Sequence, residues 1–159
     1  MRRRRKITLA CLAIASILYV GLVKAQNLYR VRIMGKNDLA YALCSFIACH
    51  HGRFPTGLNE LIDAGIAIPG ENGAMRIAQS DCWEPEGKVY GEPLPAWFLD
   101  ETAIAWGADL ASLKVDGSRV VDSDGNSVQL ITFVDDANVP SSLSRIIVEQ
   151  ARRYFPDAP

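Results

Sequence analysis

Cysteine is the residue type in this chain with the widest chemistry, and its spacing limits what it can do. The four cysteines are Cys11, Cys44, Cys49 and Cys82. On a helix, the five-residue spacing of Cys44 and Cys49 points their side chains about 140° apart, so a bridge between them is sterically disfavoured. Cys11 lies inside an apolar run, out of reach of the others. In an oxidising compartment we therefore expect Cys82 to pair with Cys44 or Cys49; the alternative is three buried thiols.

The two histidines, His50 and His51, are adjacent. Neighbouring residues on a helix point about 100° apart, so this pair would not chelate one metal ion together. Their place in a last helical turn suits a favourable contact with the helix dipole, and a metal site that includes Cys49 is the alternative. The chain has no Gly-x-Ser-x-Gly, no phosphate-binding glycine loop and no Cys-x-x-Cys. We therefore predict no catalytic, cofactor-binding or metal-binding residue, and no enzyme.

Alternate oxygen-bearing residues at Asp122-x-Asp124-Gly125-Asn126 invite a calcium interpretation, with Asp135 and Asp136 as additional ligands. The glycine falls two positions too early for an EF-hand loop, and Phe133 stands where that loop has a bidentate glutamate. A hairpin turn is the preferred interpretation of this segment, and a calcium site is the alternative.

The N-terminus has the pattern of a membrane anchor. A basic segment, residues 1–6, precedes the apolar run from Ile7 to Val23. Positive charges beside an apolar segment are typical of the cytoplasmic side. We therefore predict a cytoplasmic N-terminus at residues 1–6, a single transmembrane segment at residues 7–24 in the inner (cytoplasmic) membrane, and an extracytoplasmic domain at residues 25–159.

Two other fates of this segment are considered. Val23-Lys24-Ala25 resembles a signal-peptidase site, and cleavage after Ala25 would release an exported, soluble binding domain. A lipoprotein would use Leu9-Ala10-Cys11, but that cysteine precedes most of the apolar run instead of following it. An uncleaved anchor is the preferred interpretation.

The formal net charge of −1 conceals a segregation of charge. Arg2 to Lys6 contribute +5, so the rest of the chain carries −6. An acidic domain repels the phosphate backbone of nucleic acids. The composition therefore excludes nucleic acid as a partner, and membrane lipid is the partner expected for the N-terminal segment.

The anchor is expected to continue as a helix of about 40 residues in all. Between Gln26 and His51 there is no proline, and Gly35 is the only glycine. Apolar residues recur at helical spacing. Gly52 is placed to supply a left-handed residue at the helix end, and Pro55 prevents the helix from resuming. Two helices broken near Gly35 are the alternative.

The rest of the chain predicts short elements. Thr56 is expected to cap a short helix that buries Leu58, Leu61 and Ile62 and ends at Gly65, with an extended stretch at 66–69. Strands are expected at 97–99, 104–106, 112–115, 119–121 and 128–134, joined into an antiparallel meander by turns at Asp116-Gly117 and Asp124-Gly125-Asn126. Ser141 or Ser142 is expected to cap a last helix with Leu143, Ile146, Ile147, Gln150 and Tyr154 on one face. Trp83, Trp97 and Trp106 are expected in the core or on a sheet face.

The order of these features resembles the type IV pilin and type II secretion pseudopilin superfamily. That family has a long apolar first helix, then a Gly-(Lys/Arg)-(Tyr/Phe)-Pro turn and a Leu-x-x-Leu helix. Gly52-Arg53-Phe54-Pro55 and Leu58 to Leu61 fit this pattern, and Asp81-Cys82-Trp83 is similar to the family's Asp-Pro-Trp. The match covers roughly residues 1–85.

The resemblance is divergent at the family's processing site. Thr8-Leu9 is kept, but Lys6 replaces the small residue before the cut, and Cys11 stands where the acidic residue would be. In the family, that acidic residue pairs with a neighbouring subunit's free N-terminus inside the filament. The departures therefore indicate a minor or degenerate member that stays in the membrane.

Together these features predict an α+β fold. A long N-terminal helix, membrane-spanning in its first half, packs on a small antiparallel β-sheet with a short second helix and a C-terminal helix. The resemblance implies a structural or interaction protein of a type II secretion or type IV pilus-like apparatus. Its partners would be other pilin-like subunits or proteins of that apparatus.

Overall fold

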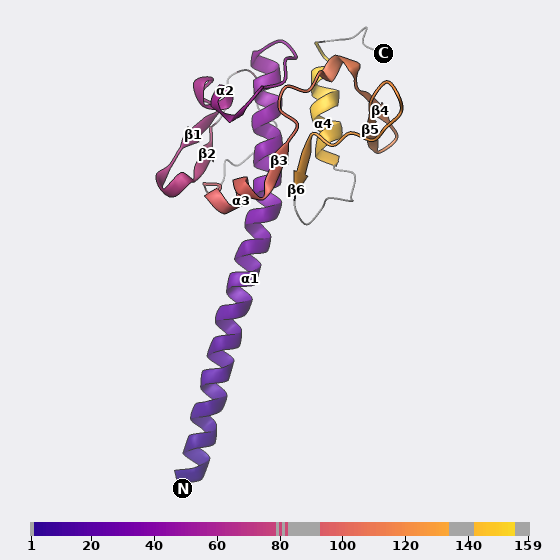
Figure 1. Cartoon of the computed structure of the whole chain (residues 1–159). Coiled ribbons are helices and arrows are strands. Elements are labelled where there is room, and N and C mark those ends of the chain that lie inside the picture. Colours follow the sequence, from indigo (N-terminus) through magenta and orange to yellow (C-terminus); the bar gives the residue numbers. More distant parts are fainter. Residues whose placement is uncertain (1, 79, 81, 83–92, 134–141, 155–159) are drawn as a thin grey trace. The chain divides into compact units, whose positions relative to one another are not determined.

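The computed structural model describes the backbone of residues 2–78, 80, 82, 93–133 and 142–154, and their side chains from Ile14 onward. The fold is α+β, as predicted. The chain divides into two compact units, Met1–Met34 and Gly35–Pro159. In chain order the elements are α1 (Arg2–Cys49), α2 (Leu58–Asp63), β1 (Ala67–Pro69), η1 (Glu71–Gly73), β2 (Met75–Ile77), α3 (Ala96–Asp100), β3 (Thr102–Ile104), η2 (Leu110–Ser112), β4 (Lys114–Asp116), β5 (Arg119–Val121), β6 (Ile131–Phe133) and α4 (Ser142–Ala151) (Figure 1).

Helix α1 is continuous over 48 residues, which confirms the single long helix and shows that a break near Gly35 is wrong. Gly35 serves a close approach instead. A Cβ atom at this position would lie 2.8 Å from Cζ of Phe98 and 3.0 Å from Cδ2 of Leu94. The glycine therefore lets the buried side chains of Leu94 and Phe98 pack directly on the helix backbone.

The unit Met1–Met34 consists of the first part of α1. The side chains of this unit that the structure describes are mostly exposed. Among the described residues, no helix combines the length and the apolar character needed to cross a membrane. The spanning segment at residues 7–24 therefore stays a prediction.

Helix α1 ends in a Schellman motif, one residue earlier than predicted. The amide of Gly52 donates to the carbonyl of Ile47 at 2.8 Å, which is the six-residue bond of that motif. His51 takes the left-handed position with φ 52°, and Gly52 follows with φ 89°. Phe54 and Pro55 are buried directly after it. The turn thus ends the helix and returns the chain to the core.

Helix α2 is capped differently from the prediction. Gly57, not Thr56, is the N-cap residue, and its position has no side-chain cap. The carboxylate of Glu60 instead accepts a hydrogen bond from the amide of Thr56 at 2.8 Å and a salt bridge from Arg53. Gly65, with φ 69°, ends the helix as expected.

The strands form separate antiparallel pairs, so the predicted meander is wrong in its connections. The described residues contain three two-stranded sheets, β1–β2, β3–β6 and β4–β5. The β4–β5 hairpin confirms the turn signal at Asp116-Gly117, where Gly117 has φ 58°. Strand β6 pairs with the distant β3, through Ile104 opposite Ile131, instead of extending from β5. The β1–β2 hairpin adds a pairing, Ala67 opposite Ile77, that the sequence did not predict.

Several strand limits are also corrected. Residues 97–99 form helix α3, because Pro95 precedes its first turn and Phe98 donates to the carbonyl of Pro95. The strand expected at 104–106 is β3, which ends at Ile104. A 3₁₀ turn, η2, occupies the start of the strand expected at 112–115. Strand β6 is Ile131–Phe133, shorter than the run at 128–134, and Val134 lies outside the described residues.

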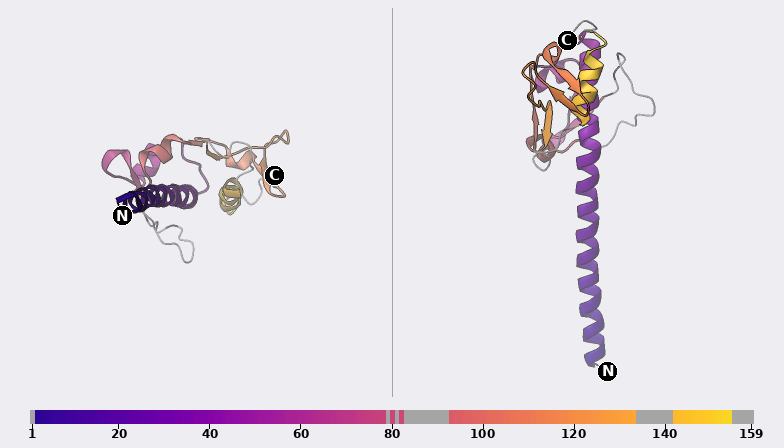
Figure 2. Two further views of the ribbon diagram at one scale, coloured as in Figure 1. Left: turned by 90° about the horizontal axis from the view of Figure 1, so that it is seen from below. Right: turned by 90° about the vertical axis from the view of Figure 1, so that its right-hand side faces the viewer.

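Within the unit Gly35–Pro159, α4 lies beside the C-terminal part of α1, and the hairpin β1–β2 lies on the other side of α1 (Figures 1 and 2). The buried face of α4 is Ser144, Ile147, Val148, Gln150 and Ala151. The predicted face is rotated, because Ile146 and Tyr154 are exposed. Ser144 accepts a hydrogen bond from the amide of Leu130 at 2.9 Å, so burying this hydroxyl satisfies the backbone of the neighbouring segment.

Candidate functional site

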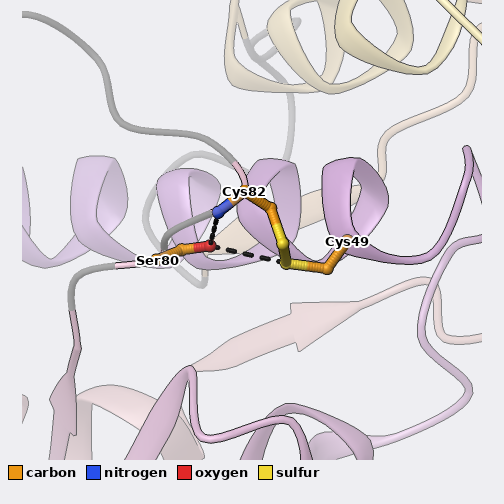
Figure 3. Close-up of a disulfide and its surroundings, with 3 residues drawn as sticks. All are labelled: Cys49, Ser80 and Cys82. Atoms are coloured by element: carbon orange, nitrogen blue, oxygen red, sulfur yellow. Dashed lines mark hydrogen bonds between the residues drawn. A yellow bond between two sulfur atoms is a disulfide. The ribbon is translucent and has the colours of Figure 1, made fainter.

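The end of α1 carries a disulfide between Cys49 and Cys82, with Cα atoms 5.3 Å apart (Figure 3). The oxygen of Ser80 lies 3.5 Å from the sulfur of Cys49 and accepts a hydrogen bond from the amide of Cys82 at 3.2 Å. This confirms the prediction that Cys82 pairs with one of the two helix cysteines, and it decides between them. The bridge ties the segment after β2 to the last turn of α1.

Cys44 is a free, buried thiol. Burial raises its pKa to about 12, although the positive charge of Arg153 acts in the opposite direction. A thiol that stays protonated is a poor nucleophile and a poor metal ligand. Cys44 therefore serves the core as an apolar residue.

The metal site that is the alternative interpretation of the end of α1 is not formed. Cys49 is consumed by the disulfide. His50 stacks on Phe46, with ring centroids 4.0 Å apart, and His51 approaches Tyr154 edge-on at 6.5 Å. No group of three His, Cys, Asp or Glu side chains within the described part of the chain could hold a metal ion.

The loop of Asp122 is a turn held by its own carboxylate. One oxygen of Asp122 accepts the amides of Asp124 and Asn126 at 3.0 and 2.8 Å, and the other accepts the side-chain amide of Asn126 at 3.2 Å. The hydrogen bonds from Asn126 are the main cause of the lowered pKa of this carboxyl. The preferred hairpin interpretation fits this geometry, because both oxygens are already engaged within the loop. The additional calcium ligands, Asp135 and Asp136, lie outside the described residues.

A cavity of about 340 Å³ lies where the turn after α1 meets the turn before η2. Its polar lining includes His51, Arg53, Thr56 and Asp109. Arg53 is held by Glu60 and lies over the ring of Phe46, and Asp109 accepts the amide of Ala111. These charged groups thus already have partners in the fold, and their arrangement provides no nucleophile with an adjacent base.

The tryptophans that the structure describes belong to the core, as expected, although Trp97 lies on a helix. Trp97 and Trp106 are partly buried and pack against the core cluster. Trp97 meets Phe98 edge-to-face, with centroids 6.1 Å apart. Trp83 and Asp81 lie outside the described residues.

The most conspicuous exposed feature is the part of α1 from Ile14 to Met34, named here the stem. Ile17 is 72% exposed and Tyr29 is 69% exposed. The other large apolar side chains exposed on the stem are Ile14, Leu18, Tyr19, Val20, Leu22, Leu28, Ile33 and Met34. Large exposed apolar patches are characteristic of surfaces that contact lipid or protein, so the stem is the candidate functional surface.

The apolar run from Ile7 to Val23 predicts the first part of the stem, whereas residues 25–34 are expected only as the start of the extracytoplasmic domain. The missed feature is that the exposed apolar character continues beyond Lys24, through Leu28 and Tyr29 to Met34. The available signal was the absence of any acidic residue before Asp38.

Comparisons with known proteins do not add a relative to this description. No family model matches the chain, no curated protein matches it, and no solved structure matches it. The resemblance carried by Gly52-Arg53-Phe54-Pro55 therefore rests on the residues themselves.

Proposed function

We propose that this chain is a membrane-anchored, pseudopilin-like structural protein that works by binding other proteins and not by catalysis. Its first helical half would span the inner membrane once, with residues 1–6 in the cytoplasm and the domain on the outer side. It would be a minor or degenerate component of a type II secretion or type IV pilus-like apparatus.

The observation that carries the proposal is the distribution of apolar residues around the stem. At about 100° per residue, Ile14, Ile17, Leu18, Tyr19 and Val20 point in directions that together surround the helix, and all five are exposed. A helix that is apolar all around requires an apolar environment on every side. Lipid supplies that environment, and the apolar run begins at Ile7, before the first side chain that the structure describes.

The second support is the way the helix ends. Its last part, from Leu39 to Ala48, is buried except for the half-buried Tyr41, and the turn Gly52-Arg53-Phe54-Pro55 places Phe54 in the same core. The short helix α2 follows with Leu61 fully buried. A long helix, a turn with Phe54 and Pro55 buried, and a short helix follow one another in the order that the resemblance implies, and this order motivates the assignment to a pilin-like apparatus.

The alternative function is an exported soluble binding domain released after Ala25. Ala25 lies in the middle of the continuous helix α1. Cleavage there would require the helix to unwind, and it would leave Leu28, Tyr29 and Met34 exposed on a soluble protein. These two points favour the retained anchor.

The mature N-terminus separates the two functions. Mass spectrometry of the chain purified from membranes should give a first residue of Met1 or Ile7, and the chain should stay with the membrane pellet after alkaline carbonate extraction. A chain that starts at Gln26 and appears in the supernatant would contradict the anchor.

Assembly is tested separately by oxidative crosslinking in membranes. Because Cys49 and Cys82 are bridged and Cys44 is buried, Cys11 is the thiol expected to react. Copper phenanthroline should produce a disulfide-linked dimer, and Cys11→Ser should abolish it. A monomer under oxidising conditions, in a chain that resists carbonate, would contradict close packing of subunits at the stem while leaving the anchor in place.

A further inference from the structure

Charge is divided sharply between the first helix and the rest of the chain. No acidic residue precedes Asp38, whereas nine of the 17 basic residues do. Five of the nine form the run Arg2–Lys6, and the others are Lys24, Arg30, Arg32 and Lys36. The stem therefore carries cations on the outer side of the proposed membrane segment, where an anchor needs none for its orientation.

In the segment Lys24–Met34, cations and apolar residues alternate around the helix. At about 100° per residue, the order around the helix axis is Lys24, Leu28, Arg32, Tyr29 with Ile33, Arg30 and Met34. Lys24, Arg30 and all four of these apolar side chains are exposed. A partner helix would cover one side of this segment only. An environment that offers both anionic groups and apolar chains on every side is the interface of a lipid bilayer.

We propose that the segment Lys24–Met34 binds the headgroups of anionic phospholipids in the outer leaflet. This inference rests on the proposed function, because it requires Val23 to end the membrane-spanning run. Lys24 would then lie at the headgroups. Arg30 would lie about 9 Å further along the helix axis, which is within the Debye length at physiological salt.

Each part of the segment has a role in this binding. The exposed cations Lys24 and Arg30 attract lipid phosphates, and Tyr29 places an aromatic ring at the level where tyrosine is enriched in membrane proteins. Leu28 and Met34 are exposed beside them and contact the upper parts of the acyl chains. Because one cation near an anionic surface contributes about 1 kcal/mol, or about fivefold in an equilibrium constant, losing two should reduce the local enrichment of anionic lipid by up to about thirtyfold.

The experiment uses the full chain in vesicles, with Tyr29→Trp as a reporter inside the segment. Quenching of this tryptophan by brominated phosphatidylglycerol is compared with quenching by brominated phosphatidylcholine, at one lipid composition. The chain without the substitution gives the background from the native tryptophans. The reporter reads the leaflet beside residue 29, so lipid gathered by Arg2–Lys6 on the opposite side does not contribute.

The test variant is Lys24→Gln with Arg30→Gln, and the control is Lys114→Gln with Arg119→Gln, which removes two exposed cations from the hairpin β4–β5. We expect preferential quenching by phosphatidylglycerol, lost in the test variant and in high salt but kept in the control. Equal quenching by both lipids, or an unchanged preference in the test variant, would overturn the inference while the carbonate-resistant chain upholds the anchor. Removal of the chain by carbonate would instead overturn the anchor and this inference together.

Discussion

The Cys49–Cys82 disulfide should be a main source of the stability of the unit Gly35–Pro159, and its contribution follows from its position. The two cysteines are 33 residues apart in the sequence. Closing a loop of this length removes chain entropy from the unfolded state that corresponds to about 3.7 kcal/mol at 25 °C. Cys82 is exposed and Cys49 is half-buried, so replacing both by alanine leaves little cavity in the core. The loop term should therefore dominate the loss.

Equilibrium urea unfolding of the full chain in detergent micelles measures this contribution. Trp97 and Trp106 pack against the core and report unfolding by fluorescence. We expect Cys49→Ala with Cys82→Ala to lower the free energy of unfolding by roughly 3–4 kcal/mol, within the range of native disulfides. Reduction of the wild-type chain should lower it by a similar amount.

The reductant provides the matched control. It should destabilise the wild-type chain and leave the double alanine variant unchanged, whereas Cys44→Ala, which keeps the bridge, should stay sensitive to it. A loss below about 1 kcal/mol in the double variant, together with a wild-type stability that does not change on reduction, would contradict a bridge between Cys49 and Cys82, because a closed loop of this length must restrict the unfolded chain.

Two further predictions concern the core around α1. Gly35→Ala should destabilise the domain by about 1–3 kcal/mol, because its Cβ would lie 2.8 Å from the buried ring of Phe98. The control is Gly21→Ala, whose Cβ would meet nothing within 4 Å. If urea unfolding shows Gly35→Ala to be the more stable of the two variants, the close approach at Gly35 is contradicted. Because the pKa of Cys44 is raised to about 12 in the folded domain, the unfolded chain loses this proton first, and stability should fall by up to about 1.4 kcal/mol per pH unit from about pH 9 towards 12. Unfolding curves of wild type and Cys44→Ala at pH 8, 10 and 11 measure this difference, and parallel pH profiles would contradict it.

The features that sequence predicted well are those fixed by local chemistry. The helix α1 follows from a long stretch without proline, and its end follows from the residues at 51–55. The β4–β5 hairpin follows from Asp116-Gly117, since glycine there adopts φ 58° at little cost. Such signals act within a few residues, so they can be recognised without knowledge of the core.

The features that sequence missed depend on distant partners. Trp97-Phe98-Leu99 has the composition of a strand, but Phe98 is fixed by packing on Gly35 and by a tilted ring contact with Phe133, at a centroid distance of 5.7 Å. The pairing of β6 with β3 joins segments separated by the β4–β5 hairpin. The choice of Cys49 over Cys44 depends on which one the chain after β2 reaches. None of these is visible in the spacing of nearby residues.

Helix α1 gives the chain two chemically opposite surfaces on one continuous backbone. From Leu39 to Ala48 its side chains, apart from the half-buried Tyr41, are buried by the domain, and Gly35 marks where that packing begins. From Ile14 to Met34 the apolar side chains have no comparable cover among the described residues. Burying them would release free energy of about 25 cal/mol per Å², whether the cover is lipid or other subunits. That uncovered surface, and not a pocket or a reactive side chain among the described residues, is therefore the feature on which the proposed membrane and subunit contacts rest.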